Sequence, residues 1–313
     1  MITKGEKFAF ILIGVLIVAT FIFWKDVKTL VAGKAAVTEE RSKSKKEKKG
    51  DKKKGDNDKS ANAKDDEGKV AVLQTWNMPS SLLEISGISY IGNNRFACVQ
   101  DELGKIYIYN ISSSKVEKEI PFGPMGDYEG IAVVGSTAYV LRADGRIFEV
   151  KNYESNPTVT QHVTSLTVKQ DVEGITYDKK NNRLLLAIKG KEANNSDYKG
   201  IYGFDLATKK LGVTPVYKID LNQTIFTNAR GKNKLEPSDI DIHPITGDLY
   251  ITEGATPKLF IMGADGSYKN IYNLSNEIFP QPEGIAFTPT GELFISNEGR
   301  KGTGTILKIA INQ

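Results

Sequence analysis

Acidic side chains recur in this sequence within a short motif, acidic-x-[Ser/Glu]-Gly-Ile, whose composition suits the binding of a cation. The motif occurs five times, and two copies are imperfect: one begins with Gln and one has Asp in place of Gly. Positions one and three are two residues apart, so on a β-strand their side chains point to the same side. The copies are Glu84–Ile88, Asp127–Ile131, Asp171–Ile175, Glu236–Ile240 and Gln281–Ile285.

The third motif position carries the residues best suited to hold a metal. It is Glu in three copies and Ser in two, at Glu129, Glu173, Glu283, Ser86 and Ser238. The motif copies together carry seven carboxylates there and at position one, which would repel one another if gathered unpaired. Ca²⁺ would relieve that repulsion, because it takes six to eight oxygen ligands with little demand on geometry, whereas Mg²⁺ requires stricter octahedral placement. The alternative is that Arg142, Lys189 and backbone N–H groups neutralise the acids, which then only hold neighbouring elements in register.

The spacing of the motif indicates the fold that positions these acids. Residues 70–313 read as short strands rich in Val, Ile, Tyr and Phe between Gly, Asn and Asp turns, which predicts an all-β domain. The fourth motif positions are separated by 43, 44, 65 and 45 residues. A period near 44 with four strands per unit is typical of a β-propeller, here with five four-stranded antiparallel blades. The long interval is one blade with insertions at 190–199 and 221–236, and the strand Val70–Trp76 completes the last blade and closes the ring.

This topology brings further polar residues to the same face as the motif. Because neighbouring strands are antiparallel, each inner strand begins where the second strand of its blade ends. The residues expected at those second-strand ends are Asp101, Arg142, Lys189, Glu253 and Glu298. Arg142, Lys189, Glu253 and Glu298 are therefore candidate ligand-binding residues around the mouth of a central channel. Both insertions reach this face and are candidate partner contacts or a lid.

The first 69 residues differ in character from the propeller. Phe8 to Trp24 is a run of 17 uncharged residues, about 26 Å long as a helix, which predicts a transmembrane anchor within residues 1–33; a cleaved signal peptide is the alternative. Residues 34–69 are rich in Lys and acids and poor in apolar residues, which predicts a disordered linker. Lys residues flank the apolar run on both sides, so charge does not decide which side of the membrane the propeller occupies.

Charge and the scarcity of Cys and His exclude several classes of function. The chain has a net charge of +4, but residues 70–313 carry 25 basic and 27 acidic residues, so no nucleic-acid partner is expected. One Cys excludes an intrachain disulfide framework and a multi-thiolate zinc site, and two His argue against a His-rich metal centre. We expect Cys98, His162 and His243 to have structural roles.

The anchor, the charged linker and the repeated motif resemble the bacterial SdiA-regulated, YjiK-like propellers. The segments that carry the resemblance are Asp171–Ile175, Glu236–Asp241, Gln281–Ile285, Pro244–Ile251 and Pro289–Ile295, and the last two are also similar to turns of NHL-type repeats. The resemblance implies a five-bladed propeller with bound calcium, attached to the plasma (inner) membrane and extracytoplasmic, with no established reaction. It implies calcium ligation by Glu129, Glu173 and Glu283, with Asp239 as a further candidate. Copies one and four carry Ser, so a fivefold-symmetric ring of ligands is not expected.

Two functions follow from these observations. The first is a binding module that holds Ca²⁺ at the channel mouth and takes an unknown small-molecule or protein ligand at that face. The alternative is a Ca²⁺-dependent hydrolase of phosphoesters or lactones, in which the metal polarises the substrate and activates water.

Overall fold

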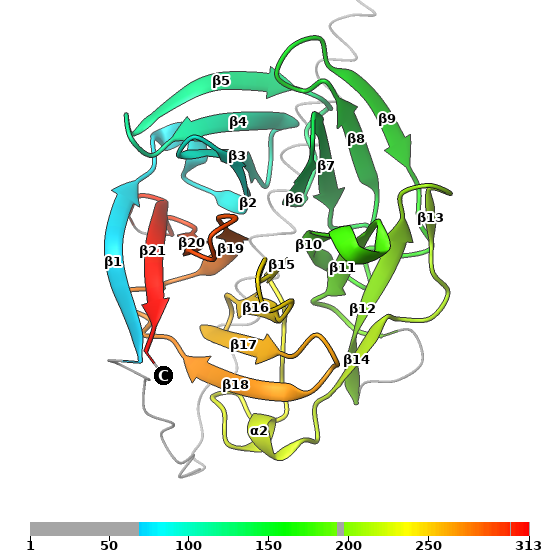
Figure 1. Ribbon diagram of the computed structural model, residues 1–313, viewed down its shortest axis with the longest axis vertical. Coiled ribbons are helices and arrows are strands. Elements are labelled where there is room, and N and C mark those ends of the chain that lie inside the picture. The colour runs from blue at the N-terminus through cyan, green and yellow to red at the C-terminus, as the bar shows by residue number, and fades with distance from the viewer. Residues whose placement is uncertain (1–68, 193–196, 301, 313) are drawn as a thin grey trace, which may run out of the picture. The chain divides into compact units, whose positions relative to one another are not determined.

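The computed structural model describes residues 69–192, 197–300 and 302–312. They form five antiparallel sheets arranged around a common centre, as Figure 1 shows. The five-bladed propeller predicted from the motif spacing is confirmed. The expected membrane segment at 8–24 and nearly all of the expected linker lie outside the described residues. Among the described residues, no helix is both long enough and apolar enough to cross a membrane.

Each blade is a meander of strands numbered outward from the channel. Blade 1 contains β2 (Ile85–Gly92), β3 (Arg95–Gln100), β4 (Lys105–Asn110) and β5 (Lys115–Pro121). Blade 2 contains β6 (Tyr128–Val134), β7 (Thr137–Arg142), β8 (Ile147–Lys151) and β9 (Thr158–His162). Blade 4 contains β15 (Asp239–Ile242), β16 (Leu249–Glu253), β17 (Lys258–Met262) and β18 (Tyr268–Asn273).

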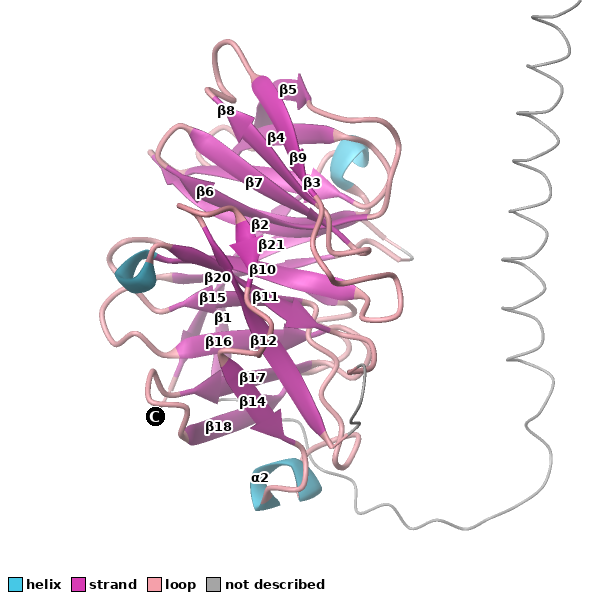
Figure 2. Cartoon of the chain, turned by 90° about the vertical axis from the view of Figure 1, so that its right-hand side faces the viewer, coloured by secondary structure: helices cyan, strands magenta, loops and turns pink. Residues whose placement is uncertain are grey.

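The third blade departs from this plan at its outer edge. It contains β10 (Val172–Asp178), β11 (Arg183–Ile188), β12 (Tyr198–Asp205), β13 (Lys210–Leu211) and β14 (Tyr217–Asp220). Both β13 and β14 pair with β12, so the outer strand of this blade is in two pieces. A short helix, α2 (Thr224–Thr227), follows β14 and lies beside β18 of blade 4 (Figures 1 and 2). Two 3₁₀ turns, Ser80–Leu82 and Lys179–Asn181, complete the elements.

The last blade is built from both ends of the described chain. It contains β19 (Pro282–Phe287), β20 (Leu293–Asn297), β21 (Thr305–Ile311) and the first strand, β1 (Val70–Asn77). Strand β1 pairs antiparallel with β21 from Val70 opposite Ile311 to Asn77 opposite Thr305. The predicted closure of the ring by an N-terminal strand is therefore confirmed.

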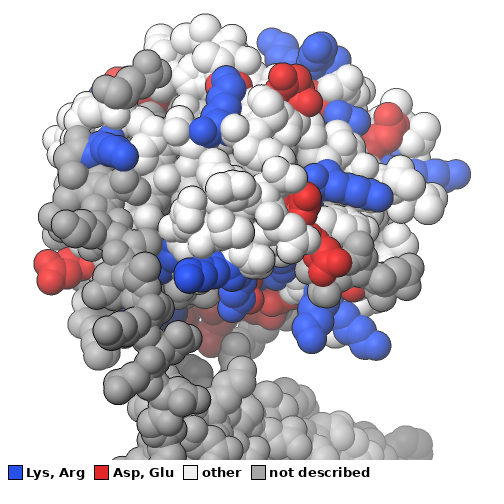
Figure 3. Space-filling model, turned by 90° about the horizontal axis from the view of Figure 1, so that it is seen from below, with Lys and Arg blue, Asp and Glu red and all other residues white. Residues whose placement is uncertain are grey.

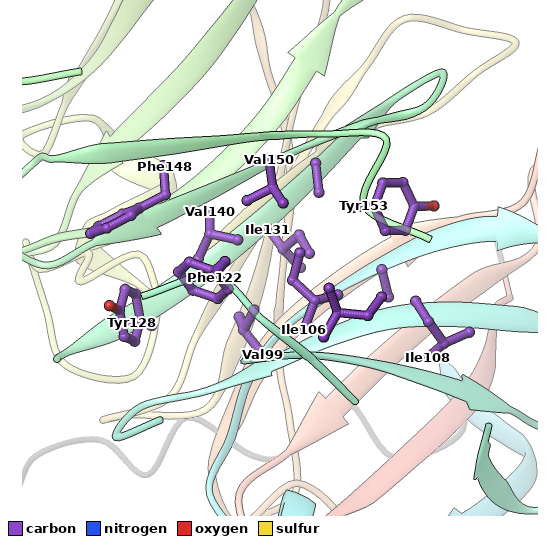
Figure 4. Packing of buried hydrophobic residues seen from close by; sticks show 13 residues of the cluster. Val99, Ile106, Ile108, Phe122, Tyr128, Ile131, Val140, Phe148, Val150 and Tyr153 are labelled. Carbon is purple, nitrogen blue, oxygen red and sulfur yellow. The ribbon is translucent and has the colours of Figure 1, made fainter. Parts of the chain in front are cut away.

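The core consists of five apolar clusters, each between two neighbouring blades. Side chains of one blade's inner three strands interdigitate with those of the next, as alternating strands buried on both faces require. Figure 4 shows the cluster between blades 1 and 2, where Val99 and Ile106 meet Ile131 and Val140. Phe122, Tyr128 and Phe148 extend it with edge-to-face ring contacts at 4.9–5.4 Å. These five clusters hold the inner strands, and hence the motif, at fixed positions around the channel.

Candidate functional site

Four of the five motif copies contain a β-bulge at the third motif position. Between β2 and β3, Ile85 faces Gln100 and Gly87 faces Val99, which leaves Ser86 as the extra residue. The ladders of β6, β10 and β19 shift in the same way around Glu129, Glu173 and Glu283. A bulge re-aims its side chain and breaks strict alternation. The expectation that positions one and three share one side of a regular strand is thus wrong: position one precedes the strand, and in these copies position three is the bulged residue.

The glycines at the fourth position bring the inner strands into direct contact. A Cβ on Gly87 would lie 2.7 Å from the Cα of Gly130, and one on Gly284 would lie 3.0 Å from the backbone nitrogen of Ile88. Only glycine permits this approach of one backbone to another. The inner ends of the blades therefore touch, and the channel is narrow at the level of the motif.

Blade 4 places Asp239 where the other copies have glycine. Its Oδ1 accepts hydrogen bonds from the backbone N–H of Ile175 at 3.1 Å and of Ile240 at 2.8 Å, and its Oδ2 accepts one from Ile285 at 3.0 Å. The residue is 1% exposed. This carboxylate ties the inner strands of blades 3, 4 and 5 together, which is the register-holding role considered as the alternative to metal binding.

Three glutamates and one lysine form the acidic part of the channel mouth. Glu173 is 4% exposed, Glu283 is 9% exposed and Glu129 is half-buried. The Nζ of Lys189, which follows β11, lies 2.5 Å from Oε1 of Glu173. The other oxygen of Glu173, Oε2, is buried and has no hydrogen-bond partner among the described residues.

The cluster holds three carboxyl groups and only one amino group, and this imbalance shifts their pKa values. Burial raises the pKa of Glu129 well above its ordinary value, and the charges of Glu173, Asp127 and Glu283 raise it further. Burial also raises the pKa of Glu173, against the opposing charge of Lys189, and that of Glu283. Burial disfavours the charged form of Lys189, but the charge of Glu173 and its hydrogen bond outweigh burial and raise the lysine pKa. Lys189 therefore remains an ammonium that serves several carboxylates.

Glu283 is held by a different set of neighbours. Its Oε1 lies over Gly254, the residue after β16, where a Cβ would approach it to 2.9 Å. Burial, the largest contribution, raises its pKa, and the charge of Lys189 and hydrogen bonds with Gln281 and Ser238 lower it. The Ser of copy four thus supports the Glu of copy five across the blade boundary. No group of three or more His, Cys, Asp or Glu side chains in the described part of the chain forms a preformed metal site.

The remaining candidates at this face lie in separate environments. Arg142 makes a two-point ion pair with Asp144, 3.0 Å from Nε to Oδ1 and 2.5 Å from Nη2 to Oδ2. Glu253 is fully buried, and its Oε2 lies 2.8 Å from the Nζ of Lys258. Glu298 accepts a hydrogen bond from the side-chain amide of Gln281. Of the four expected ligand-binding residues, Lys189 lies within the cluster of Glu129, Glu173 and Glu283, and Glu298 borders it through its charge on Glu283 and its hydrogen bond with Gln281.

Asp101 is a residue of this face that the sequence analysis located but did not select. It follows β3, and its Oδ1 is buried without a hydrogen-bond partner. Burial and the charges of Glu84, Glu102, Glu298 and Asp127 raise its pKa from 3.8 to about 7. The sequence feature that could have identified Asp101 is its place at a second-strand end beside Glu102. Its environment depends on residues from three blades, which spacing alone does not reveal.

The insertion at 221–236 is packed into the fold and does not form a free lid. Phe226 and Leu235 of this insertion are fully buried, so these side chains pack in the core and are not available to a partner. The Nζ of Lys258 donates to the carbonyls of Arg230 at 2.8 Å and Lys234 at 3.2 Å. The other insertion is described in part, and there Lys199 Nζ donates to the carbonyls of Lys189 and Gly190.

The histidines and the cysteine lie away from the acidic mouth. His162 Nε2 lies 2.7 Å from Oε2 of Glu149, which also pairs with Lys209 of blade 3 at 2.8 Å. His243 accepts backbone hydrogen bonds at Nδ1 within the turn after β15. Cys98 is fully buried in the cluster between blades 5 and 1.

On the edge of the propeller near α2 and β18, Figure 3 shows basic and acidic side chains scattered among uncharged ones.

Comparisons with solved structures agree with the fold. The glutaminyl cyclase of Myxococcus xanthus has a TM-score of 0.56 at 13% identity, covering 77% of this chain and 95% of that one. A Bacteroides thetaiotaomicron protein of unknown function has a TM-score of 0.47 at 14% identity, covering 75% and 56%. Streptogramin B lyase has a TM-score of 0.44 at 13% identity, covering 77% and 98%. The agreement in fold rests on the cyclase, and at 13% identity the cyclase is similar to this chain in fold alone.

Sequence comparison identifies the family. No curated protein sequence matches the chain. The model of the SdiA-regulated family matches residues 113–300, which run from blade 1 to the last blade and include four of the five motif copies. The bulged glutamates, Gly130, Gly284 and Asp239 lie within that match, whereas Gly87 lies before it. The chain belongs to the SdiA-regulated family.

Proposed function

We propose that this protein is a binding module whose ligand or partner docks at the acidic channel mouth, with Ca²⁺ held there by Glu129, Glu173 and Glu283. The propeller of this family suits a binding role in general. The observation that carries the proposal is the buried Oε2 of Glu173, which has no hydrogen-bond partner among the described residues. A buried carboxylate oxygen without a donor costs free energy that a bound cation would recover.

The residues present fit a hard divalent cation. Three carboxylates and the ammonium of Lys189 leave an excess of two negative charges when all are ionised. Ca²⁺ accepts carboxylate oxygens from one side of a site and completes its shell with water or ligand oxygens. Such a shell does not require three protein side chains to converge in advance. Asp239, whose oxygens accept backbone hydrogen bonds, is assigned to holding the blades and not to ligation.

Arg142, Lys189 and Glu298 would then contact the docked ligand at the rim. Arg142 and Lys189 are partly exposed, with side-chain exposures of 21% and 29%. Glu253 is fully buried and is left out of this set.

The same proposal includes the membrane. We place the propeller outside the cytoplasm, on the plasma (inner) membrane, with residues 8–24 as a single-pass anchor and 34–69 as the linker. Its support is the run of 17 uncharged residues and the family resemblance described above. Trypsin should cleave the Lys-rich linker and release the propeller from right-side-out membrane vesicles, but not from inverted ones. The opposite pattern would reverse the assigned side, and release from neither would remove the linker assignment.

A hydrolase is the second candidate, and Asp101 is the observation that favours it. A carboxyl with a pKa of about 7 can accept a proton near neutral pH, as a general base must. It lies at a second-strand end, the same side of the propeller as the motif. Turnover of a phosphoester or lactone that is lost in Asp101→Asn and in metal-free protein would support this function. A failed screen of both substrate classes would leave the binding module.

Thermal unfolding of the purified full-length chain tests the central claim. After removal of metal, added Ca²⁺ should raise the unfolding midpoint by the linkage RT ln(1 + [L]/Kd), and Mg²⁺ should raise it less. Glu173→Gln should abolish the Ca²⁺ response, whereas Glu292→Gln, in the β19–β20 turn, should preserve it. An equal response in both variants, or no response in metal-free wild-type protein, would contradict Ca²⁺ binding at this mouth.

A further inference from the structure

The propeller has a cavity at the end of the channel opposite the motif. It has a volume of about 590 Å³ and is lined by residues of β2, β6, β10, β15 and β19, together with the turns that follow them. All five inner strands therefore contribute to one pocket. Its volume lies within the range of about 300–1,000 Å³ in which proteins bind small molecules.

The fifth motif residues form the apolar base of this pocket. They are Ile88, Ile131, Ile175, Ile240 and Ile285, each no more than 2% exposed. Asp239 binds the backbone N–H groups of three of these isoleucines. The isoleucines and this carboxylate lie between the pocket and the bulged glutamates, so this site is distinct from the acidic mouth.

The charges in the pocket have one sign. Its lining includes Asp241 and Glu154 but no Lys, Arg or His. Glu154 is neutralised by Arg95, with Nη1 2.7 Å from Oε2. Asp241 has no ion pair within the described chain; it accepts hydrogen bonds from Thr176 Oγ1 at 2.6 Å and from the backbone N–H of Ile242 and Phe287, both at 2.8 Å.

Asp241 is therefore an anion without an ion pair among the described residues, in a wall that combines apolar side chains with hydroxyl and backbone groups. Burial raises its pKa to about 6, and hydrogen bonds from Thr176 and Phe287 oppose the shift, so the carboxylate is ionised at pH 7.5. Three donors leave one lone-pair direction of the carboxylate for a further donor. Asp241 is half-buried and lines the pocket, so a ligand in the pocket can reach it.

We propose that this opposite-mouth pocket binds a small organic amine, with its ammonium group on Asp241 and its apolar body against the partly exposed side chains of Ile91, Val133 and Ile242. These side chains favour a hydrocarbon or aromatic body, whose burial is worth about 25 cal/mol per Å² of apolar surface. The single uncompensated carboxylate selects a cation over a neutral or anionic head group of the same size. An inorganic cation would leave these apolar side chains without a partner. Ser89 and Thr176 place hydroxyl groups on the same walls, which suits a head group with more than one N–H.

Matched probes test the proposal on the full-length chain at pH 7.5. The probes are 4-phenylbutylamine, 4-phenylbutan-1-ol and 4-phenylbutyrate, which share a body and differ in head group. We expect saturable binding by calorimetry and by thermal shift, with the amine about tenfold tighter than the alcohol, which corresponds to about 1.4 kcal/mol. The carboxylate should bind more weakly than either. Equal binding of amine and alcohol by the wild-type protein, or no saturable binding of the amine, would overturn the proposal.

Variants assign the preference to Asp241. Asp241→Asn should reduce binding of the amine about tenfold and leave the alcohol within about twofold. The matched control is Glu154→Gln, which removes the other acid of the pocket and should change neither. Val133→Trp, which fills the pocket without changing its charge, should abolish binding of both probes. An amine preference that persists in Asp241→Asn, or binding that survives Val133→Trp, would place the probe elsewhere.

Two further comparisons cover a variant that does not fold and separate this proposal from the Ca²⁺ proposal. If Asp241→Asn does not fold, the head-group comparison in wild-type protein and the loss in Val133→Trp still decide the proposal. Glu173→Gln should leave amine binding unchanged, because it alters the other mouth of the channel. Failure of the Ca²⁺ proposal and failure of this one therefore give different results.

Discussion

The carboxylate of Asp239 in blade 4 accepts a hydrogen bond from the backbone N–H of Ile285 in blade 5, with 3.0 Å between Oδ2 and the nitrogen. The same side chain also binds the N–H of Ile175 in blade 3. Asp239 occupies the motif position that is glycine in the other four copies, and its carboxylate thus joins three blades. The acids of this motif therefore have two roles: one joins blades, and the bulged glutamates leave negative charge at the channel mouth.

Replacing Asp239 with Asn should destabilise the propeller strongly. The substitution keeps the size of the side chain but turns one acceptor into an NH₂ group that faces a backbone N–H. Leaving one or two buried donors unpaired costs about 2–4 kcal/mol, or roughly 5–15 °C in the unfolding midpoint of a domain this size. Thermal unfolding measures this, with Asp265→Asn in an exposed turn as the control. A midpoint within about 2 °C of wild type would show that water satisfies these donors.

Replacing Lys189 with Met should make stability depend on Ca²⁺ more strongly than in the wild-type protein. Without metal the variant loses the cation that pairs with Glu173, and breaking a buried pair from one side costs about 3–5 kcal/mol. Because the lysine is 29% exposed, we expect the lower end of that range or less. With Ca²⁺ present, the metal compensates the charge of Glu173. Because Lys189 no longer competes for the carboxylates, the variant should bind Ca²⁺ more tightly.

The measurement is the unfolding midpoint of Lys189→Met and wild type over a Ca²⁺ titration. The two curves should converge as Ca²⁺ increases. Lys118→Met provides the control, because Lys118 lies on the outer strand of blade 1, away from the mouth, and donates to the backbone carbonyl of Glu154 in the β8–β9 turn of blade 2. Parallel curves for Lys189→Met and wild type would mean that Lys189 and the metal do not share carboxylates.

Asp101 should make the protein less stable as pH rises. Its pKa is about 7 in the folded protein and about 3.8 when unfolded, so the folded state binds the proton more tightly. Its contribution to stability is complete below about pH 4 and is lost as pH rises toward 7. Asp101→Asn should remove this loss and raise stability at pH 8 by about 1–2 kcal/mol, a figure reduced for the partial exposure of the group.

Unfolding midpoints of Asp101→Asn and wild type from pH 3.5 to 8 test this difference. The two should agree at the acid end and diverge above pH 5, with the variant more stable. Asp205→Asn, at the end of β12, removes an acid whose pKa is lowered by hydrogen bonds from Thr208, and it should shift stability in the opposite sense. A constant difference between Asp101→Asn and wild type at all pH values would exclude titration of Asp101 as its cause.

The sequence could predict the ring but not the environment of each acid. Blade number, closure by Val70–Trp76 and the face that carries the motif follow from a repeat near 44 residues, because spacing and strand order determine them. Whether Glu253 is buried against Lys258 or open to a ligand depends on an insertion whose packing has no period. Asp239 and Glu129 occupy neighbouring positions of one motif, yet hydrogen-bond donors from other blades surround the first and carboxylates surround the second. The bulge at position three was also not predicted, because it appears in the ladder between strands and not in residue types.

The buried pair of Glu253 and Lys258 provides the last prediction. Both side chains are essentially unexposed, and Lys258 also donates to the carbonyls of Arg230 and Lys234 in the 221–236 insertion. Lys258→Met leaves a buried carboxylate and two carbonyls without their donor, which should cost about 3–5 kcal/mol. Glu253→Gln alone should cost less, because the amide can still accept from the ammonium.

A double-mutant cycle separates the pair from its surroundings. In Glu253→Gln with Lys258→Met the uncompensated charge is gone, so the double variant should be more stable than Lys258→Met alone by about 1 kcal/mol or more. Hydrogen exchange should rise in residues 221–236 of both variants that lack Lys258, since the carbonyls of the insertion lose their anchor in each. Additive costs in the cycle would show that Glu253 and Lys258 stabilise the protein independently. Unchanged exchange in the insertion would mean that the burial of Phe226 and Leu235 is enough to hold it in place.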